Sequence, residues 1–257
     1  MKYSYTICSG WWCSDDFREY TFGDESIRGK DFHQLWYNSV TKFTTPNKIF
    51  ICNNNAPILP NYNNMIEFTS LNVNAGHATK LLNNQKYCGW TSSVLLGLSY
   101  TELSDSDYFV YVEQDVLLYG KNIVECSIDK MKKNKTNVIF GRPRSSPQPL
   151  EVSFFIVRKS YINKLASRYK SINYDDSKVS PEVKLALSII GAHKLPLFMT
   201  GNSYFQYILK RLMNKKYFHD FGYGRHKPID FNDDYFYFQH GDVDELKYYK
   251  EKTGCIL

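Results

Sequence analysis

The stretch that decides the fold is DYFVYVEQDVLLYG, residues 107–120. It holds five consecutive apolar or aromatic residues, Tyr108 to Val112, and then two acids separated by a single residue, Glu113 and Asp115. A short continuous apolar run of this kind predicts a β-strand that is covered on both faces of its sheet. The acids then follow the end of that strand, where ligands bind in α/β sheets.

The same reading along the chain predicts an alternation of strands and helices. Strands are expected at 3–8, 48–52, 65–68, 108–112, 137–141 and 151–158, and helices at 30–42, at roughly 87–102 and from Pro181 onward. An aromatic stretch at 235–242 precedes a short charged helix. Strands alternating with helices over the first 140 residues indicate an α/β fold, and the later strands indicate a mixed sheet that is mostly parallel and flanked by helices.

Composition limits the class of protein. The chain has 257 residues, a formal charge of +6 and six cysteines, none of them in a C-x-x-C pair. Reduced thiols and a cytoplasmic location are therefore expected, and no apolar run is adequate for a signal peptide or a membrane span. The positive charge suits an anionic ligand: a nucleotide phosphate, a membrane surface or a nucleic acid.

The two acids predict a cation site. Alternate residues of an extended segment point the same way, so Glu113 and Asp115 are expected to converge while Gln114 turns aside. Two convergent carboxylates repel each other unless a cation lies between them or one of them takes a proton. Carboxylate oxygens suit Mg²⁺ or Mn²⁺, which can also bridge to phosphate oxygens. The alternative interpretation is a pair of solvated acids that merely end a strand.

In this respect DSDYFVYVEQDVLLYG resembles the metal-binding region of nucleotide-sugar-dependent glycosyltransferases of the GT-A fold. CSG at 8–10, ICNNN at 51–55 and NAGHATKLL at 74–82 add to the resemblance, which covers about residues 1–160. It implies one Rossmann-like, GT-A-type domain over 1–257, with a nucleotide-sugar-binding half at 1–120 and an acceptor-binding half at 121–257. The residues that it implies for donor binding are Ser9, Gly10, Asn53, Gly76, His77, Lys80, Glu113 and Gln114.

The first acid departs from the family pattern, because Glu113 stands where those enzymes have Asp. Its longer side chain leaves three alternatives: direct contact with the metal, contact through water, or a bond to the ribose. Asp115 is the firmer metal ligand, and the resemblance implies His240 as a third. The alternative for His240 is an imidazole that bonds to backbone at a strand end.

Two further parts of the resemblance concern helix starts. Gly76 and His77 are expected to open a helix whose backbone N–H groups bind a diphosphate, with Lys80 as countercharge; plain turn chemistry is the alternative. Glu182 follows Ser180 as N-cap and Pro181 at the first helical position. The resemblance implies Glu182 as the general base, whereas an acid that only stabilises the helix start is the alternative.

The predicted activity is therefore metal-dependent transfer of a sugar from a nucleoside-diphosphate-sugar to a hydroxyl of a glycan or lipid-linked glycan. Inversion is expected if Glu182 is the base, and retention, which needs no such base, is the alternative. A nucleotidyltransferase is one alternative, although CSGWWCSDD lacks the glycine-rich basic loop of such enzymes. A non-catalytic protein that binds glycans or nucleic acid is the other. Because the aromatic residues lie mostly in predicted strands, no nucleic-acid partner is expected, and peripheral contact with a membrane stays an open alternative.

Overall fold

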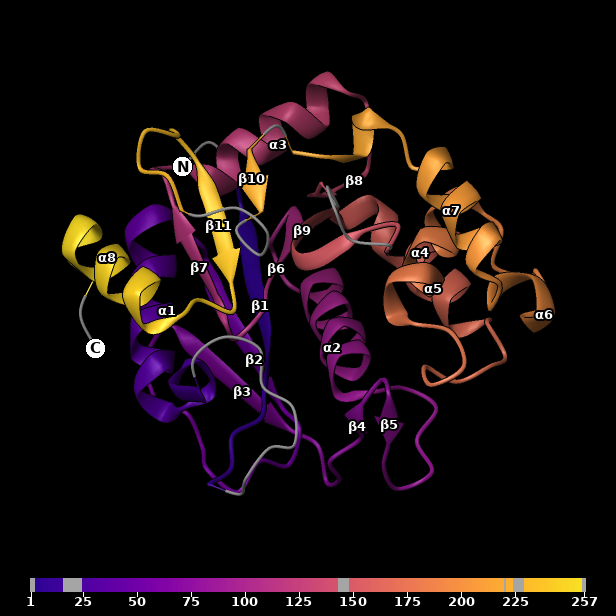
Figure 1. The fold of residues 1–257 in the computed structure, drawn as a ribbon, viewed down its shortest axis with the longest axis horizontal. Coiled ribbons are helices and arrows are strands. Elements are labelled where there is room, and N and C mark those ends of the chain that lie inside the picture. Colours follow the sequence, from indigo (N-terminus) through magenta and orange to yellow (C-terminus); the bar gives the residue numbers. More distant parts are fainter. Residues whose placement is uncertain (1–2, 16–24, 143–147, 220, 224–228, 256–257) are drawn as a thin grey trace.

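The fold is a mixed α/β arrangement around one six-stranded sheet, seen in a computed structural model that describes residues 3–15, 25–142, 148–219, 221–223 and 229–255 (Figure 1). The strand order is β3-β2-β1-β6-β9-β8. The strands are β1 (Tyr5–Trp11), β2 (Lys48–Asn53), β3 (Ile66–Ser70), β6 (Tyr108–Val112), β8 (Val138–Gly141) and β9 (Glu151–Arg158). Only β9 runs against its neighbours. The predicted mixed, mostly parallel sheet is confirmed.

Two smaller sheets complete the β-structure of the described residues. β11 (Phe236–Gln239) lies between β10 (Gly222–Tyr223) and β7 (Val116–Tyr119), and it is antiparallel to β7. This pairing brings the aromatic stretch near the C-terminus back to the segment that follows β6. The second small sheet is a hairpin of β4 (Gly76–His77) and β5 (Lys80–Leu81), so the prediction of a helix at 74–82 is wrong.

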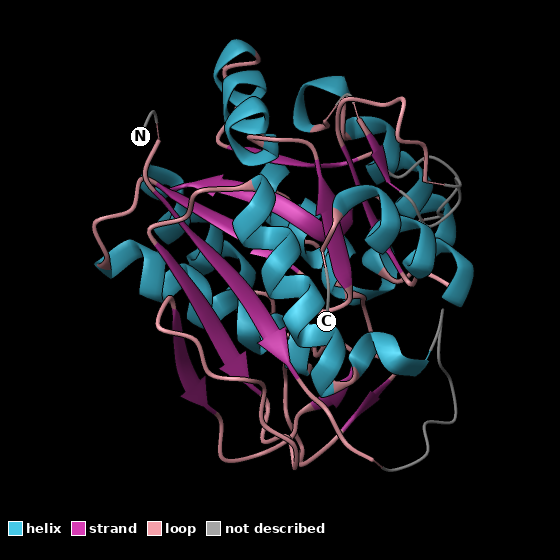
Figure 2. Ribbon diagram, turned by 90° about the vertical axis from the view of Figure 1, so that its left-hand side faces the viewer, coloured by secondary structure: helices cyan, strands magenta, loops and turns pink. Residues whose placement is uncertain are grey.

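Helices cover both faces of the central sheet (Figure 2). They are α1 (Lys30–Phe43), α2 (Gly89–Leu103), α3 (Ile123–Lys133), α4 (Lys159–Lys170), α5 (Pro181–Ile190), α6 (Leu197–Thr200), α7 (Ser203–Leu212) and α8 (Val243–Thr253), with 3₁₀ turns at Glu25–Arg28 and Lys215–Tyr217. Ser180 and Pro181 start α5 as predicted, but the Ser180 side chain makes no capping hydrogen bond. Within the described residues, no helix combines the length and apolar character needed to cross a bilayer.

Strand β6 illustrates why the sequence folds in this way. Tyr108, Val110 and Val112 belong to one hydrophobic cluster, and Phe109 and Tyr111 belong to the cluster on the opposite face. Both sets are buried, as the continuous apolar run predicts for a strand with two covered faces.

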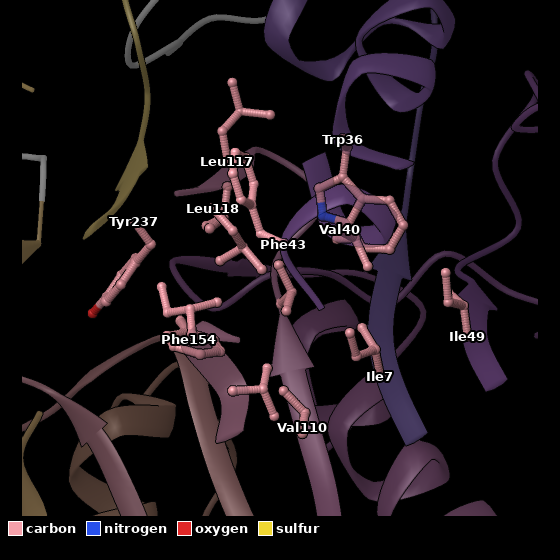
Figure 3. Packing of buried hydrophobic residues seen from close by; sticks show 14 of the residues in the cluster. Ile7, Trp36, Val40, Phe43, Ile49, Val110, Leu117, Leu118, Phe154 and Tyr237 are labelled. Atoms are coloured by element: carbon pink, nitrogen blue, oxygen red, sulfur yellow. The ribbon is translucent and has the colours of Figure 1, made fainter. Parts of the chain in front are cut away.

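Each cluster belongs to a different group of helices. The first contains residues of α1, α3, α8, β7 and β11, and Figure 3 shows Trp36 and Val40 of α1 in the same cluster as Ile7 and Val110 of the sheet. The second cluster contains residues of α2, α4, α5 and α7. All six cysteines are free thiols, in agreement with the sequence prediction. The carboxyl edge of the sheet, where β1, β2, β3 and β6 end, is the edge at which the candidate site lies.

Candidate active site

A tight turn, rather than a continued strand, presents the two acids. After β6 ends at Val112, the backbone N–H of Glu113 donates to the Ser153 carbonyl at 2.9 Å, and the N–H of Val116 donates back to the Glu113 carbonyl at 3.1 Å. The indole of Trp36 donates to the same carbonyl at 3.0 Å. The prediction that an extended segment aligns the two carboxylates is therefore wrong, because a turn orients them.

The two carboxylates do converge, on the side chain of Gln239. Its amide nitrogen, Nε2, donates to Glu113 Oε2 at 2.9 Å and to Asp115 Oδ1 at 2.9 Å. The two acidic oxygens therefore lie within twice that distance of each other. Gln239 reaches them because β11 pairs with β7 in a register that places Gln239 opposite Val116.

His240 completes the cluster from the next position along the chain. Its Nε2 lies 3.0 Å from Asp115 Oδ2, an ion pair whenever the imidazole is protonated, and the Asp115 side chain is only 2% exposed. His240 has φ of +59°, a backbone conformation that is uncommon for a residue with a side chain. Such conformations persist where the surrounding structure enforces them, often at functional sites. The three predicted metal ligands thus come together, along with Gln239, which was not among the predicted site residues.

The donor chemistry of this cluster suits a hard divalent cation. Two carboxylates and an imidazole are ligands that Mn²⁺ accepts, so Glu113, Asp115 and His240 would be the residues that hold it. In the structure the amide nitrogen of Gln239 donates to both acids. Turning that amide by half a rotation would present its oxygen, an acceptor, in place of the donor. As they stand, no three His, Cys, Asp or Glu side chains in the described part of the chain are arranged to hold a metal ion.

Gln114 points away from the acids, as predicted. Its Oε1 accepts from the backbone N–H of Trp12 at 2.8 Å, and its Nε2 donates to the Trp12 carbonyl at 3.1 Å. This pair of bonds ties the turn after β6 to the chain that leaves β1. A role of Gln114 in donor binding stays a prediction.

Three other predicted donor-binding residues lie at the strand ends and carry packing contacts. A Cβ at Gly10 would lie 2.7 Å from Ser93 Oγ on α2, so glycine lets β1 and α2 approach closely. Asn53 donates to Ser70 Oγ at 3.2 Å and accepts from the Ala56 N–H at 3.0 Å, which closes the turn after β2. The Ser9 side chain is buried and donates to the Gly10 carbonyl.

The expected phosphate-binding helix start is not at Gly76. Gly76, His77 and Lys80 lie in the β4–β5 hairpin, and the helix that follows, α2, begins at Gly89. At that start the backbone N–H of Cys88 donates to Asp176 Oδ2 at 2.8 Å. A carboxylate of the protein therefore already occupies the position that a phosphate would take at this helix terminus.

Glu182 lies in the first turn of α5, with its carboxylate only half satisfied. Gln148 Nε2 donates to Glu182 Oε1 at 3.0 Å, whereas Oε2 is buried and has no hydrogen-bond partner among the described residues. Buried polar atoms are nearly always paired, so a carboxylate oxygen without a partner in the described part of the chain is available to accept a hydrogen bond from a bound ligand.

A buried ion pair fixes the start of α5 against the start of α2. Lys184 Nζ lies 2.8 Å from Asp176 Oδ1, and neither side chain is exposed. The other oxygen of Asp176 caps α2 at Cys88. Burial lowers the pKa of Lys184, an effect that Asp176 opposes. This ion pair therefore holds α5, and with it Glu182, in position relative to the sheet edge.

Two more buried polar atoms near the start of α2 have no partner within the described residues. They are Asn54 Oδ1, in the turn after β2, and Trp90 Nε1, in the first turn of α2. Asn54 adjoins the helix start, because a Cβ at Gly89 would lie 3.2 Å from Asn54 Oδ1. Unpaired donors and acceptors at the edge where the acids lie are the kind of groups that a polar ligand would satisfy.

Comparison with known proteins gives no match in sequence: no protein-family model matches the chain, and no curated protein is significantly similar. Among solved structures, 4-diphosphocytidyl-2C-methyl-D-erythritol synthase from Anaerococcus prevotii aligns over 71% of this chain and 81% of its own, with 11% identity and a TM-score of 0.43. The galactosyltransferase LgtC, solved with donor and acceptor sugar analogues, aligns over 71% and 69%, with 12% identity and a TM-score of 0.41. S. aureus TarS aligns over 96% of this chain and 38% of its own, with 9% identity and a TM-score of 0.43.

Proposed function

We propose that the protein is a glycosyltransferase that takes a sugar from a nucleoside-diphosphate-sugar and transfers it to a hydroxyl of a glycan or glycolipid. The observation that carries this proposal is the convergence of Glu113 and Asp115 on Gln239, with His240 against Asp115, where β6 ends. Ligands of open α/β sheets bind at that edge. The acids agree with the resemblance of this segment to the GT-A-type metal motif.

In this proposal Asp115, with Glu113 and His240, would hold Mn²⁺ or Mg²⁺. The bound cation would neutralise the charge that develops on the diphosphate leaving group. Gln239 keeps the two acids together, since one amide group donates to both. Trp36 and Ser153 fix the backbone of Glu113, which holds the turn at the edge of the sheet. The half of the chain up to residue 120 would bind the donor, and the remainder would bind the acceptor.

Glu182 would act as the general base. Its Oε2 would take the proton of the acceptor hydroxyl, while the bond from Gln148 to Oε1 orients the carboxylate. Direct attack by that hydroxyl on the sugar carbon, opposite the leaving diphosphate, inverts the configuration. A buried oxygen without a partner in the described chain is what such a role requires before the acceptor binds.

A hydrolysis screen over nucleoside-diphosphate-sugars, with and without manganese, tests the proposal. Wild-type protein should release a nucleoside diphosphate from one donor class, and Asp115→Asn should lower that rate roughly a hundredfold or more. Asp105→Asn, which changes an exposed acid beyond the end of α2, should act as wild type. Release of pyrophosphate from a nucleoside triphosphate would instead identify a nucleotidyltransferase. Tight polynucleotide binding that Asp115→Asn leaves unchanged would overturn the proposal.

A further inference from the structure

Helices α6 and α7 expose an unusual amount of apolar side chain. On α7, Leu209 and the following Met213 are buried against the protein. The other side of the helix carries Tyr204, Tyr207, Ile208 and Leu212 at spacings of three, four and eight residues, which place them on one face. All four are exposed, Tyr204 by 71%. The helix is therefore apolar on its outer as well as its inner side.

Helix α6, which contacts α7, carries further exposed apolar side chains. Phe198 is 81% exposed, and its neighbours Leu197 and Met199 are exposed as well. Figure 1 places α6 and α7 at the end of the molecule opposite α8, outside α4 and α5. We use the name α6–α7 surface for Leu197, Phe198, Met199, Tyr204, Tyr207, Ile208 and Leu212. Seven large apolar residues gathered on two adjacent elements mark an interaction site rather than scattered surface residues.

The segment that carries this surface contains charges of one sign only. Residues 183–219 contain no Asp or Glu, although the whole chain has 26 of them. The same segment carries five cations besides the buried Lys184: Lys194, Lys210, Arg211, Lys215 and Lys216. Arg211 lies on the outer face of α7 itself, with its guanidinium 5.5 Å from the centre of the Tyr207 ring. The partner of this surface must therefore accept apolar side chains and carry negative charge.

We propose that the α6–α7 surface docks the protein on an anionic phospholipid bilayer. In such a complex α7 lies in the plane of the interface, with the tyrosines and Phe198 among the headgroups and upper acyl chains and the cations against lipid phosphates. Rings with one apolar and one polar end favour this boundary. A second copy of the chain is a poor occupant, because two such segments, each with cations and no acids, would repel each other.

Vesicle partitioning tests this inference with the whole chain and independently of catalysis. Wild-type protein should sediment with vesicles of phosphatidylcholine and phosphatidylglycerol in equal parts, and far less with phosphatidylcholine alone. Binding should weaken as salt is raised, because screening removes the attraction to the anionic headgroups. A protein that sediments equally with both kinds of vesicle, or with neither, would contradict the inference.

Two double variants and two controls locate the surface. Phe198→Ser with Tyr207→Ser, and Lys210→Gln with Arg211→Gln, should each lower the partition coefficient roughly tenfold or more. Leu103→Ser removes a leucine that is 89% exposed at the end of α2, and Lys247→Gln removes an exposed cation of α8; both should bind as wild type. Circular dichroism checks that all variants are folded.

The remaining outcomes are equally decisive. Losses of the same size in the controls would mean that general charge and hydrophobicity, not this surface, drive binding. A concentration-dependent dimer that the Phe198→Ser/Tyr207→Ser variant abolishes would assign the surface to a second copy instead. Hydrolysis of a soluble donor should be unchanged in every variant, so failure of this inference leaves the proposed function untouched.

Discussion

The imidazole of His240 lies 3.0 Å from the carboxylate of Asp115, although the two residues belong to opposite halves of the chain. The pairing of β11 with β7 brings them together, and the left-handed backbone at His240 ends β11 where the chain turns towards α8. The histidine therefore depends on the C-terminal part of the fold for its position. The candidate site is complete only when both halves of the chain are in place.

Replacing His240 by asparagine should separate the imidazole from the backbone conformation. Asparagine tolerates the left-handed region, so the turn after β11 is kept while the ring is lost. We expect manganese affinity and donor hydrolysis to fall by at least roughly tenfold, with little change in the melting temperature. Calorimetric titration with manganese and a hydrolysis assay measure the two effects.

His193→Asn is the matched control, because His193 lies in the turn after α5 and contributes to no part of the cluster. It should bind manganese and hydrolyse donor as wild type does. If His240→Asn melts much earlier but binds manganese normally, the histidine stabilises the β11 turn and is not a ligand.

Replacing Glu182 by glutamine should remove the base but keep the shape. The new amide oxygen can still accept from Gln148, so α5 and the fold are retained. Transfer to an acceptor should fall roughly a hundredfold, while affinity for the donor nucleotide stays the same. Initial rates of transfer and a nucleotide titration make the comparison, with Glu251→Gln on the exposed side of α8 as the control. Transfer at the wild-type rate would move the role to another acid, with Glu151 on β9 as the next candidate.

Much of the central sheet could be predicted from local patterns. The apolar run Tyr108–Val112 and the run at 151–158 became β6 and β9 with the predicted bounds, because strands buried on both faces are nearly continuous apolar runs. The prediction of a helix start at 74–82 is wrong, since a glycine before a few helix-forming residues also suits a tight hairpin. Gly76 has φ of +76°, a left-handed conformation that glycine can adopt in this hairpin.

The site could be predicted only in part. Glu113 and Asp115 were recognisable because they follow a buried strand, whereas Gln239 lies in a strand whose antiparallel register with β7 no local pattern contains. Its place directly before His240 was the one available signal. The way in which the acids converge also escaped prediction, because it depends on the turn that Trp36 and Ser153 hold from distant parts of the chain.

The buried pair of Lys184 and Asp176 predicts a large and specific loss of stability. Lys184→Met leaves the Asp176 carboxylate buried without its counter-ion, which should lower the free energy of unfolding by about 3–5 kcal/mol. Adding Asp176→Asn should restore part of this loss, because the uncompensated charge is removed and the amide oxygen can still cap α2. Urea unfolding of the single and double variants gives the three values.

The surface pair of Lys178 and Asp175 is the control for that measurement. Its atoms lie 3.5 Å apart and both side chains are partly exposed, so Lys178→Met should cost less than about 1 kcal/mol. Losses of equal size for Lys178→Met and Lys184→Met would show that burial of the Lys184 pair does not govern its contribution.

Acid should destabilise the protein through His33. This residue is buried on α1, stacks on Trp36 at 5.5 Å, and has Nε2 without a hydrogen-bond partner among the described residues. Burial lowers the pKa of His33 to about 4 from its ordinary 6.5. Between these two pH values the unfolded chain binds a proton at His33 that the folded protein does not bind. The free energy of unfolding therefore decreases as the pH falls through 6.5, and His33 causes no further decrease below about pH 4.

From about pH 7 to about pH 5 this linkage should remove about 2 kcal/mol of unfolding free energy from the wild type. His33→Phe keeps a ring against Trp36 and cannot take a proton, so it should lose that much less over the same interval. Urea unfolding at several pH values measures both proteins, with His193→Gln as a control at a less buried histidine. Equal losses of unfolding free energy in the wild type and in His33→Phe would mean that other groups cause the acid sensitivity. His33 would then be protonated in the folded state at a pH where its burial beside Trp36 predicts a neutral ring.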